Sequence, residues 1–199
     1  MDKLLGLYGG TFDPPHKAHL EVANAFLNGF EGASLTVMPC LIPPHKMRDT
    51  GGADEHHRLN MTKLCFGSLK GVNVSDYELK SGGTSYTYLT VKHLQAENPK
   101  AKICLVMGQD NLLIIEKWRE YRYLLDNCVI AVAVRGGEPL SPMVQALGDK
   151  YGADIRILNM DSFPLSSTAV RRAVRLGLPF GDMVTNGVEA YIKSEGLYK

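Results

Sequence analysis

Two histidines three residues apart, His16 and His19, stand near the start of the chain behind a glycine-rich turn. The turn follows a short apolar run, Leu4–Tyr8, and continues as GGTFDPPHKAH to the second histidine. Pro14 and Pro15 cannot extend a strand, and proline pre-sets φ for a helix start. Side chains three apart lie over one face of a helix, whose N-terminal N–H groups also attract anions. The segment therefore predicts a phosphate-binding site.

A second group of candidates lies near the other end of the chain, where hydroxyl residues precede two arginines. Hydroxyls at a helix start can cap its N–H groups and can also bind phosphate oxygens. A plain helix cap is an equally good interpretation of this segment taken alone. The residues are Ser166, Ser167, Thr168, Arg171 and Arg172, and we expect Arg172 to face solvent.

Two further segments have residue types suited to nucleotide recognition. After the second apolar run, a Pro-Pro turn presents His45 and Lys46, and a lysine can neutralise outer phosphates as a point charge. A solvated loop lysine is the alternative. Trp118 is the only tryptophan, and its charged neighbours indicate a partly exposed ring that can stack on a flat heteroaromatic. Packing in the core is the alternative for this ring.

The elements that must position these residues follow an alternating pattern of short apolar runs and helical stretches. Six strands alternating with helices predict an α/β fold, a Rossmann-like doubly wound parallel sheet with a small C-terminal helical appendage. Ligands bind such sheets at the carboxyl ends of the strands, which is where the first motif lies. The expected strands are Leu4–Tyr8, Ser34–Pro39, Val72–Tyr77, Lys102–Met107, Cys128–Val134 and Ile155–Asn159.

Helix boundaries can be assigned from capping residues and prolines. Asp54, either Thr84 or Ser85, and Ser141 before Pro142 are the expected caps. After the last strand we expect two helices, Ser167–Leu176 and Gly187–Ser194. The chain is predicted to be one domain over residues 1–199, with a Rossmann-like core at 1–160 and a C-terminal helical part at 161–199.

Composition limits the class of protein. The 199 residues are 45% hydrophobic and 22% charged, as in an ordinary globular protein that can bury a sizeable core. A net charge of +1 does not indicate a nucleic-acid polymer as partner. We find no bilayer-spanning run and no signal peptide, so we expect no membrane partner. Four scattered cysteines without a CxxC favour a reduced cytoplasmic protein without structural zinc, and homo-oligomerisation stays open.

The first motif resembles the signature of the nucleotidylyltransferase superfamily, and LSSTAVR at 165–171 resembles its second signature. Members join a nucleoside triphosphate to a phosphate-bearing acceptor. The resemblance implies that His16, His19, Lys46 and Arg171 hold charge during catalysis, with Mg²⁺ arriving on ATP and no metal site of protein ligands. It implies that Asp110 contacts ribose hydroxyls. The implied ATP-binding residues are Gly9, Gly10, Thr11, Phe12, His16, His19, Gly108, Asp110, Ser166, Ser167, Thr168 and Arg171.

The PPHK string at 43–46 narrows the resemblance to the nicotinate-nucleotide adenylyltransferases of bacterial NAD biosynthesis. Matches continue over nearly the full length. The resemblance implies AMP transfer from ATP to nicotinate mononucleotide, giving deamido-NAD and pyrophosphate. It implies that Trp118 stacks on the pyridine ring and that Thr87 with nearby backbone groups recognises the acceptor's carboxylate. The implied acceptor-binding residues are Cys40, His45, Lys46, Tyr86, Thr87, Trp118 and Arg135.

Three positions depart from the family pattern. Ala18 replaces the usual glycine between the histidines, Cys40 stands where many members have asparagine, and Leu89 replaces a common aspartate. The last two changes concern the acceptor side. A nucleotidylyltransferase with another phosphorylated acceptor, nicotinamide mononucleotide or phosphopantetheine, therefore stays open. A non-catalytic nucleotide-binding domain is the alternative of a different class.

Overall fold

The computed structural model describes residues 3–42, 51–134, 140–158, 160 and 165–199. Its strands form one parallel sheet in the order β3-β2-β1-β4-β5-β6. Strand order reverses between β1 and β4, which confirms the doubly wound α/β fold. The strands are β1 (Lys3–Gly10), β2 (Ser34–Pro39), β3 (Val72–Val74), β4 (Ala101–Gly108), β5 (Val129–Ala133) and β6 (Ile155–Leu158).

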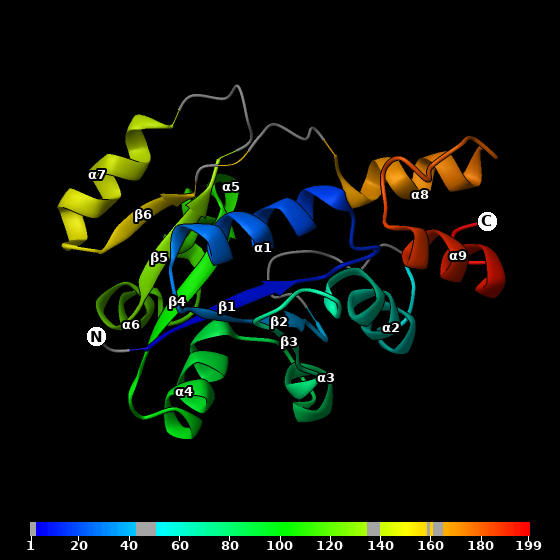
Figure 1. Cartoon of the computed structure of the whole chain (residues 1–199). Coiled ribbons are helices and arrows are strands. Elements are labelled where there is room, and N and C mark those ends of the chain that lie inside the picture. Colours follow the sequence, from blue (N-terminus) through cyan, green and yellow to red (C-terminus); the bar gives the residue numbers. More distant parts are fainter. Residues whose placement is uncertain (1–2, 43–50, 135–139, 159, 161–164) are drawn as a thin grey trace.

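Helices cover both faces of the sheet (Figure 1). Leu5 and Leu7 of β1 join the hydrophobic cluster on one face, whereas Tyr8 joins the cluster on the other. Burial on both sides explains why the strands are nearly continuous apolar runs in the sequence. The helices are α1 (Lys17–Gly29), α2 (Glu55–Phe66), α3 (Tyr77–Ser81), α4 (Thr87–Glu97), α5 (Gln109–Leu112), η1 (Ile115–Lys117), α6 (Tyr121–Asn127), α7 (Pro142–Tyr151), α8 (Ser167–Arg175) and α9 (Asn186–Glu195).

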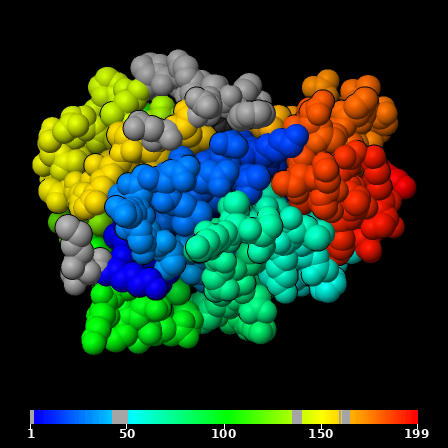
Figure 2. Space-filling model, viewed as in Figure 1, coloured from blue at the N-terminus to red at the C-terminus, as the bar shows by residue number. Residues whose placement is uncertain are grey.

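The C-terminal helices share one hydrophobic cluster with the sheet. Val170 of α8 and Val188 of α9 are fully buried in the cluster that contains Phe26 of α1 and Met61 of α2. Figure 2 shows α9, in red, beside α2, in cyan, on the molecular surface. α9 therefore packs against α2, and both C-terminal helices belong to the cluster that also contains residues of β1 and α1. The division at residue 160 stays a prediction.

Two of the expected boundaries were wrong. β3 ends at Val74 and not at Tyr77, because Tyr77 already begins α3. The N-cap of α4 is Tyr86, without a side-chain cap, and not Thr84 or Ser85. The Ser85 hydroxyl instead accepts a hydrogen bond from the backbone N–H of Leu41 at 2.9 Å. A tertiary partner has thus replaced the local capping bond.

Other expected boundaries are confirmed. Asp54 caps α2 by accepting from the backbone N–H of His57, and Ser141 caps α7 by accepting from that of Met143. Pro142 is the first residue of its helix, as predicted. Within the described residues, we find no helix that is both long and apolar enough to cross a membrane.

Candidate active site

Two adjoining cavities lie at the carboxyl ends of β1 and β4, on either side of the point where strand order reverses. The histidine cavity has a volume of about 380 Å³, and both His16 and His19 line it. The tryptophan cavity has a volume of about 150 Å³, and Trp118 lines it. The segment 9–11 and Met107 line both cavities. Molecules bound in the two cavities would therefore meet beside the glycine-rich turn.

The two histidines stack face to face at the start of α1. Their ring centroids are 3.7 Å apart and the ring planes differ by 23°. The backbone N–H of His16 donates to Nδ1 of His19 at 3.2 Å, so the proton of neutral His19 is on Nε2. Phe12, whose φ is 50°, packs edge-on against His19 with centroids 5.1 Å apart. These contacts fix the orientation of both imidazoles in the wall of the cavity.

Two buried arginines donate to the backbone of the loop between β1 and α1. Nη1 of Arg58 donates to the carbonyl of Thr11 at 2.8 Å, and Nη1 of Arg171 donates to the carbonyl of Asp13 at 2.7 Å. Arg58 is 2% exposed and Arg171 is 7% exposed. Both also line the histidine cavity. Because these charges are held away from bulk water, the cavity provides a positive potential suited to an anion.

The same loop is connected to the end of the chain. Oδ1 of Asp13 accepts a hydrogen bond from the backbone N–H of Ala53 at 2.9 Å and another from the hydroxyl of Tyr198 at 2.7 Å. Burial and the nearby Asp13 raise the pKa of Tyr198, so its hydroxyl stays protonated and donates. The C-terminal turn therefore helps to position the loop that precedes the histidines.

Each hydroxyl of the second motif has a different partner. Ser166 caps α8 by accepting from the backbone N–H of Ala169 at 3.1 Å, which confirms the capping interpretation for this residue. The hydroxyl of Ser167 donates to the carbonyl of Pro14 at 2.9 Å. Oγ1 of Thr168 accepts from Nη2 of Arg171 at 3.5 Å. Ser167 thus joins the second motif to the first.

The turn after β4 places a carboxylate at the histidine cavity. Gly108 is the N-cap of α5, and Asp110 lies in the first helical turn and is not a helix cap. A Cβ atom on Gly108 would lie 2.5 Å from Oδ1 of Asp110. Only glycine leaves room for the carboxylate in this position. Both residues line the histidine cavity.

The tryptophan cavity brings together residues of β1, β4, α3, α4 and α5 and of the segments between elements. Trp118 is half-buried at the end of η1, as expected from its charged neighbours. Thr87 is the first residue of α4, and the first turn of a helix carries N–H groups that lack intrahelical acceptors. The thiol of Cys40 donates to Oγ1 of Thr11 at 3.8 Å, and burial raises the pKa of this thiol. The cavity therefore combines an aromatic ring with a helix N-terminus.

All twelve expected ATP-binding residues line the histidine cavity, but the acceptor set is less complete. Tyr86 does not line the tryptophan cavity, and its ring instead faces the guanidinium of Arg119 at 4.9 Å. Leu89 is 47% exposed and does not line that cavity either. This departure from the family pattern therefore does not contact a molecule bound in the tryptophan cavity. Three expected residues lie outside the described residues: His45, Lys46 and Arg135.

Sequence reasoning missed several residues of the site. Arg58 on α2 is buried and its guanidinium donates to the carbonyl of Thr11, a contact between distant residues that no local signal indicated. Asn111 lines both cavities and follows the expected Asp110 by one residue. Glu78 lines the tryptophan cavity from α3, an element that was not expected.

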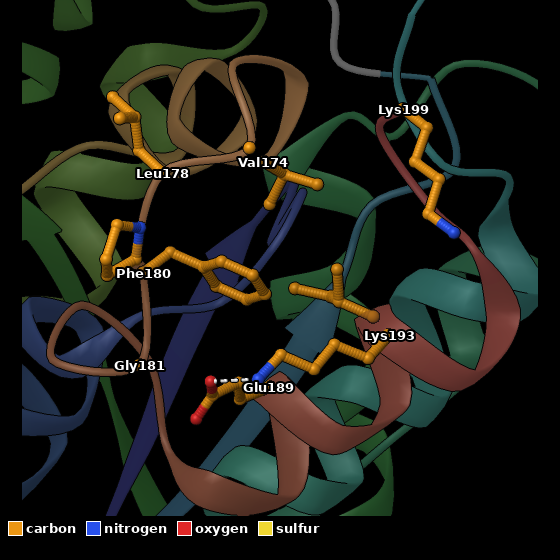
Figure 3. Close-up of a pocket in the computed structure, with 10 residues that line it drawn as sticks. Val174, Leu178, Phe180, Gly181, Glu189, Lys193 and Lys199 are labelled. Carbon is orange, nitrogen blue, oxygen red and sulfur yellow. Dashed lines mark hydrogen bonds and ion pairs between the residues drawn. The ribbon is translucent and has the colours of Figure 1, made fainter.

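A third cavity, of about 470 Å³, lies between α8 and α9 (Figure 3). Val174, Leu178 and Phe180 give it an apolar wall, and Lys193 and Glu189 form an ion pair across 2.6 Å at its side. It contains none of the expected site residues. The described residues that are expected to bind substrates thus line the other two cavities, apart from Tyr86.

Neither a metal cage nor an activated thiol is present in the described part of the chain. No group of three or more His, Cys, Asp or Glu side chains there can hold a metal ion. Burial raises the pKa values of Cys65, Cys104 and Cys128 to about 12, so these thiols are protonated at neutral pH. The site can bind and orient phosphates by charge and hydrogen bonds.

Comparison with known proteins gives a consistent result. The sequence model of the cytidylyltransferase-like family matches residues 7–173. A Clostridium tetani protein called "Probable nicotinate-nucleotide adenylyltransferase" is 30% identical over 200 residues, covering 99% of this chain and all of that protein. A Gemmatimonas aurantiaca protein of the same name is 33% identical, covering 98% of this chain and 92% of that protein.

Solved structures show the same fold. The nicotinic acid mononucleotide adenylyltransferase of Plasmodium falciparum complexed with APC superposes with a TM-score of 0.79 at 20% identity, covering 98% of this chain and 97% of that one. The same enzyme complexed with NaAD superposes with a TM-score of 0.77 at 21% identity, with the same coverage.

Proposed function

The chain belongs to the cytidylyltransferase-like family and, within it, to the nicotinate-nucleotide adenylyltransferases, and on this basis we propose that it transfers AMP from ATP to nicotinate mononucleotide. The products are deamido-NAD and pyrophosphate. The observation that supports this most is the shared edge of the two cavities at segment 9–11, because a two-substrate reaction needs two sites that meet.

We assign ATP to the histidine cavity. The stacked His16 and His19, the buried Arg171 and the start of α8 present donors and positive charge on its walls. These groups suit a triphosphate, because anions bind well at helix N-termini and beside cations. Asp110 is placed to accept hydrogen bonds from ribose hydroxyls. We call the histidine cavity the nucleotide side of the site.

We assign nicotinate mononucleotide to the tryptophan cavity. The ring of Trp118 supplies a stacking surface for pyridine, and the N-terminal turn of α4 at Thr87 supplies N–H donors for the ring's carboxylate. This cavity is the acceptor side. The roles of Lys46, His45 and Arg135 toward the substrates stay predictions from sequence.

The reaction needs no nucleophile from the protein. An oxygen of the acceptor's phosphate attacks the α-phosphorus of ATP in line, and the bond from that phosphorus to the bridging oxygen breaks as pyrophosphate leaves. Nε2–H of His19 and the guanidinium of Arg171 are placed to stabilise the charge that develops on the transferred group. Alignment of two bound substrates contributes up to roughly 7–11 kcal/mol to such a reaction.

Mg²⁺ is proposed to enter as part of the nucleotide substrate. Mg²⁺ usually keeps several waters and binds through substrate phosphates with one or two carboxylates. The carboxylates that line the histidine cavity are Asp13 and Asp110, and Asp13 already accepts two hydrogen bonds. A metal carried by the triphosphate fits this donor set. We place the enzyme in the cytoplasm because its four cysteines are all free and buried.

Pyrophosphate release and chromatographic detection of deamido-NAD test the proposal. The purified chain is mixed with Mg-ATP and, in separate arms, nicotinate mononucleotide, nicotinamide mononucleotide or phosphopantetheine. A further arm replaces ATP with CTP, since the family is named for cytidylyl transfer. We expect deamido-NAD with nicotinate mononucleotide and ATP, and much slower release in the other arms. Release with phosphopantetheine alone, or no release in any arm, would overturn the proposal.

A further inference from the structure

Glu78 has an unusual position on the acceptor side of the site. It lies on the short helix α3, is only 9% exposed, and is the only Asp or Glu among the described residues that line the tryptophan cavity. The substrate proposed for this cavity carries a carboxylate and a phosphate. A carboxyl group of the protein facing an anionic substrate requires an explanation, because two like charges in a small buried space repel.

A hydroxyl group of α4 holds the Glu78 carboxyl in place. Oγ1 of Thr90 donates to its Oε1 at 2.6 Å, and the hydroxyl of Ser85 lies close enough to lower the pKa of the carboxyl. Ser85 precedes α4, and Thr90 lies in the first turns of that helix. The carboxyl therefore joins α3 to the N-terminal part of α4, which carries Thr87 into the cavity.

The connection continues to the segment after β2. The backbone N–H of Leu41 donates to Oγ of Ser85 at 2.9 Å, and the backbone N–H of Ser85 donates to the carbonyl of Ile42 at 3.0 Å. Leu41 follows Cys40, which lines the cavity opposite the helix start. Glu78 is thus linked through Ser85 to two walls of the same cavity.

Burial raises the pKa of the Glu78 carboxyl, and the hydrogen bond from Thr90 opposes this shift. Cys40 lines the same cavity, and burial raises the pKa of its thiol as well.

The other charged groups on the packed helices have partners away from Glu78. On α3, Lys80 pairs with Asp76 at 3.0 Å. On α4, His93 stacks on Tyr77 and pairs with Glu97 at 3.3 Å, and Nζ of Lys92 lies over the ring of Tyr123 at 4.9 Å.

We propose that Glu78 is a positioning residue for acceptor binding, which holds α4 through Thr90 and so fixes where the N-terminal turn of that helix binds the acceptor's carboxylate. The inference rests on the proposed function. The Glu78 carboxyl lines the cavity because it anchors this helix, and Thr90 already donates to one of its oxygens.

Steady-state kinetics of Glu78→Leu and Glu78→Gln test this role, with Glu31→Leu on an exposed turn as the control. Glu78→Leu removes the hydrogen bond from Thr90, so KM for nicotinate mononucleotide should rise roughly tenfold while KM for ATP and kcat change by less than about threefold. Unchanged acceptor KM in Glu78→Leu would overturn the proposal. An equal rise of both KM values would also overturn it, because that result indicates a general structural defect.

Glu78→Gln keeps the shape and stays neutral at every pH, so it keeps the test valid if the leucine variant does not fold. The acceptor KM of Glu78→Gln should stay within about threefold of the wild-type value, because the glutamine amide oxygen can accept the same hydrogen bond from Thr90. A rise of about tenfold in Glu78→Gln would contradict the proposal. If the wild type itself does not use nicotinate mononucleotide, the proposed function fails instead.

Discussion

On the nucleotide side of the site two buried arginines hold one loop, whereas on the acceptor side one buried carboxyl holds one helix. Arg58 and Arg171 donate to the carbonyls of Thr11 and Asp13 in the loop before α1, and their charges stay beside the cavity. Glu78 on α3 accepts from Thr90 on α4. The first arrangement produces a fixed positive potential. The second positions a wall of the acceptor cavity.

This difference separates the expected effects of substitutions. Changes on the nucleotide side remove charge stabilisation of the transferred phosphoryl group and should lower kcat. Changes on the acceptor side remove stacking and shape, so they should raise KM for the acceptor. A single substitution that lowered kcat and raised the acceptor KM to the same extent would contradict this division into two sides.

The largest effect is expected for His19→Ala. Loss of one preorganised donor to a developing oxyanion lowers kcat by roughly 100- to 1000-fold. His56→Ala, at an exposed histidine of α2, is the matched control and should stay close to the wild type. Pyrophosphate release at saturating substrates measures both. If His19→Ala retained the turnover of His56→Ala, the nucleotide side would lose its central residue.

Neighbouring arginines of α8 provide the next test. Arg171 is buried and donates to Asp13, whereas Arg172 is exposed, as the sequence predicted. Arg171→Ala should lower kcat/KM for ATP about 100-fold and the free energy of unfolding by roughly 1–3 kcal/mol, because the Asp13 carbonyl loses its partner. Arg172→Ala should change kcat/KM for ATP by less than about twofold and the free energy of unfolding by less than about 0.5 kcal/mol. Kinetics and urea unfolding check the pair, and equal losses in both variants would contradict the assignment.

Trp118→Ala sharpens the acceptor side. Stacking of a heteroaromatic ring on an aromatic side chain contributes about 1–3 kcal/mol, so KM for nicotinate mononucleotide should rise about tenfold or more. KM for ATP should stay within about twofold. Trp118→Phe keeps a smaller aromatic ring, so its KM for nicotinate mononucleotide should lie between those of the wild type and Trp118→Ala. A larger change in KM for ATP than in KM for nicotinate mononucleotide would contradict the assignment of Trp118 to the acceptor side.

The smallest effect is expected for Tyr198→Phe. The variant loses one hydrogen bond to Asp13 and should lower the free energy of unfolding by about 1 kcal/mol. Because the loop keeps its arginine contacts, kcat should fall by only about two- to fivefold, with the acceptor KM unchanged. Tyr88→Phe on α4 is the control. A stability equal to that of the control would show that the C-terminal turn does not position the loop.

The fold and the nucleotide side could be predicted from sequence because their signals are local. The apolar runs, the glycine turn and the residues from Gly9 to His19 are contiguous, and a parallel sheet brings strand ends together at one edge. Ser167 lies far away in sequence, but its own motif is also contiguous. What joins the two motifs, the hydrogen bond from Ser167 to Pro14, appears only in the structure.

The rest depends on contacts between distant residues with weak local signals. Tyr198 reaches Asp13 across 185 positions of the chain, and nothing near either residue indicates the pair. Glu78 lies on α3, a helix of five residues that follows a strand of three, both too short to give a periodic pattern. The cap expected at Ser85 was wrong because its hydroxyl had a tertiary partner.

Fluorescence of Trp118 tests the division into two sides most directly, because it is the only tryptophan in the chain. Nicotinate mononucleotide, added without ATP, should change the emission in a saturable way, and the same titration should succeed with Arg171→Ala. A non-hydrolysable ATP analogue should bind the wild type, as measured by calorimetry, with little change in emission. A saturable emission change with the ATP analogue and none with nicotinate mononucleotide would contradict the account.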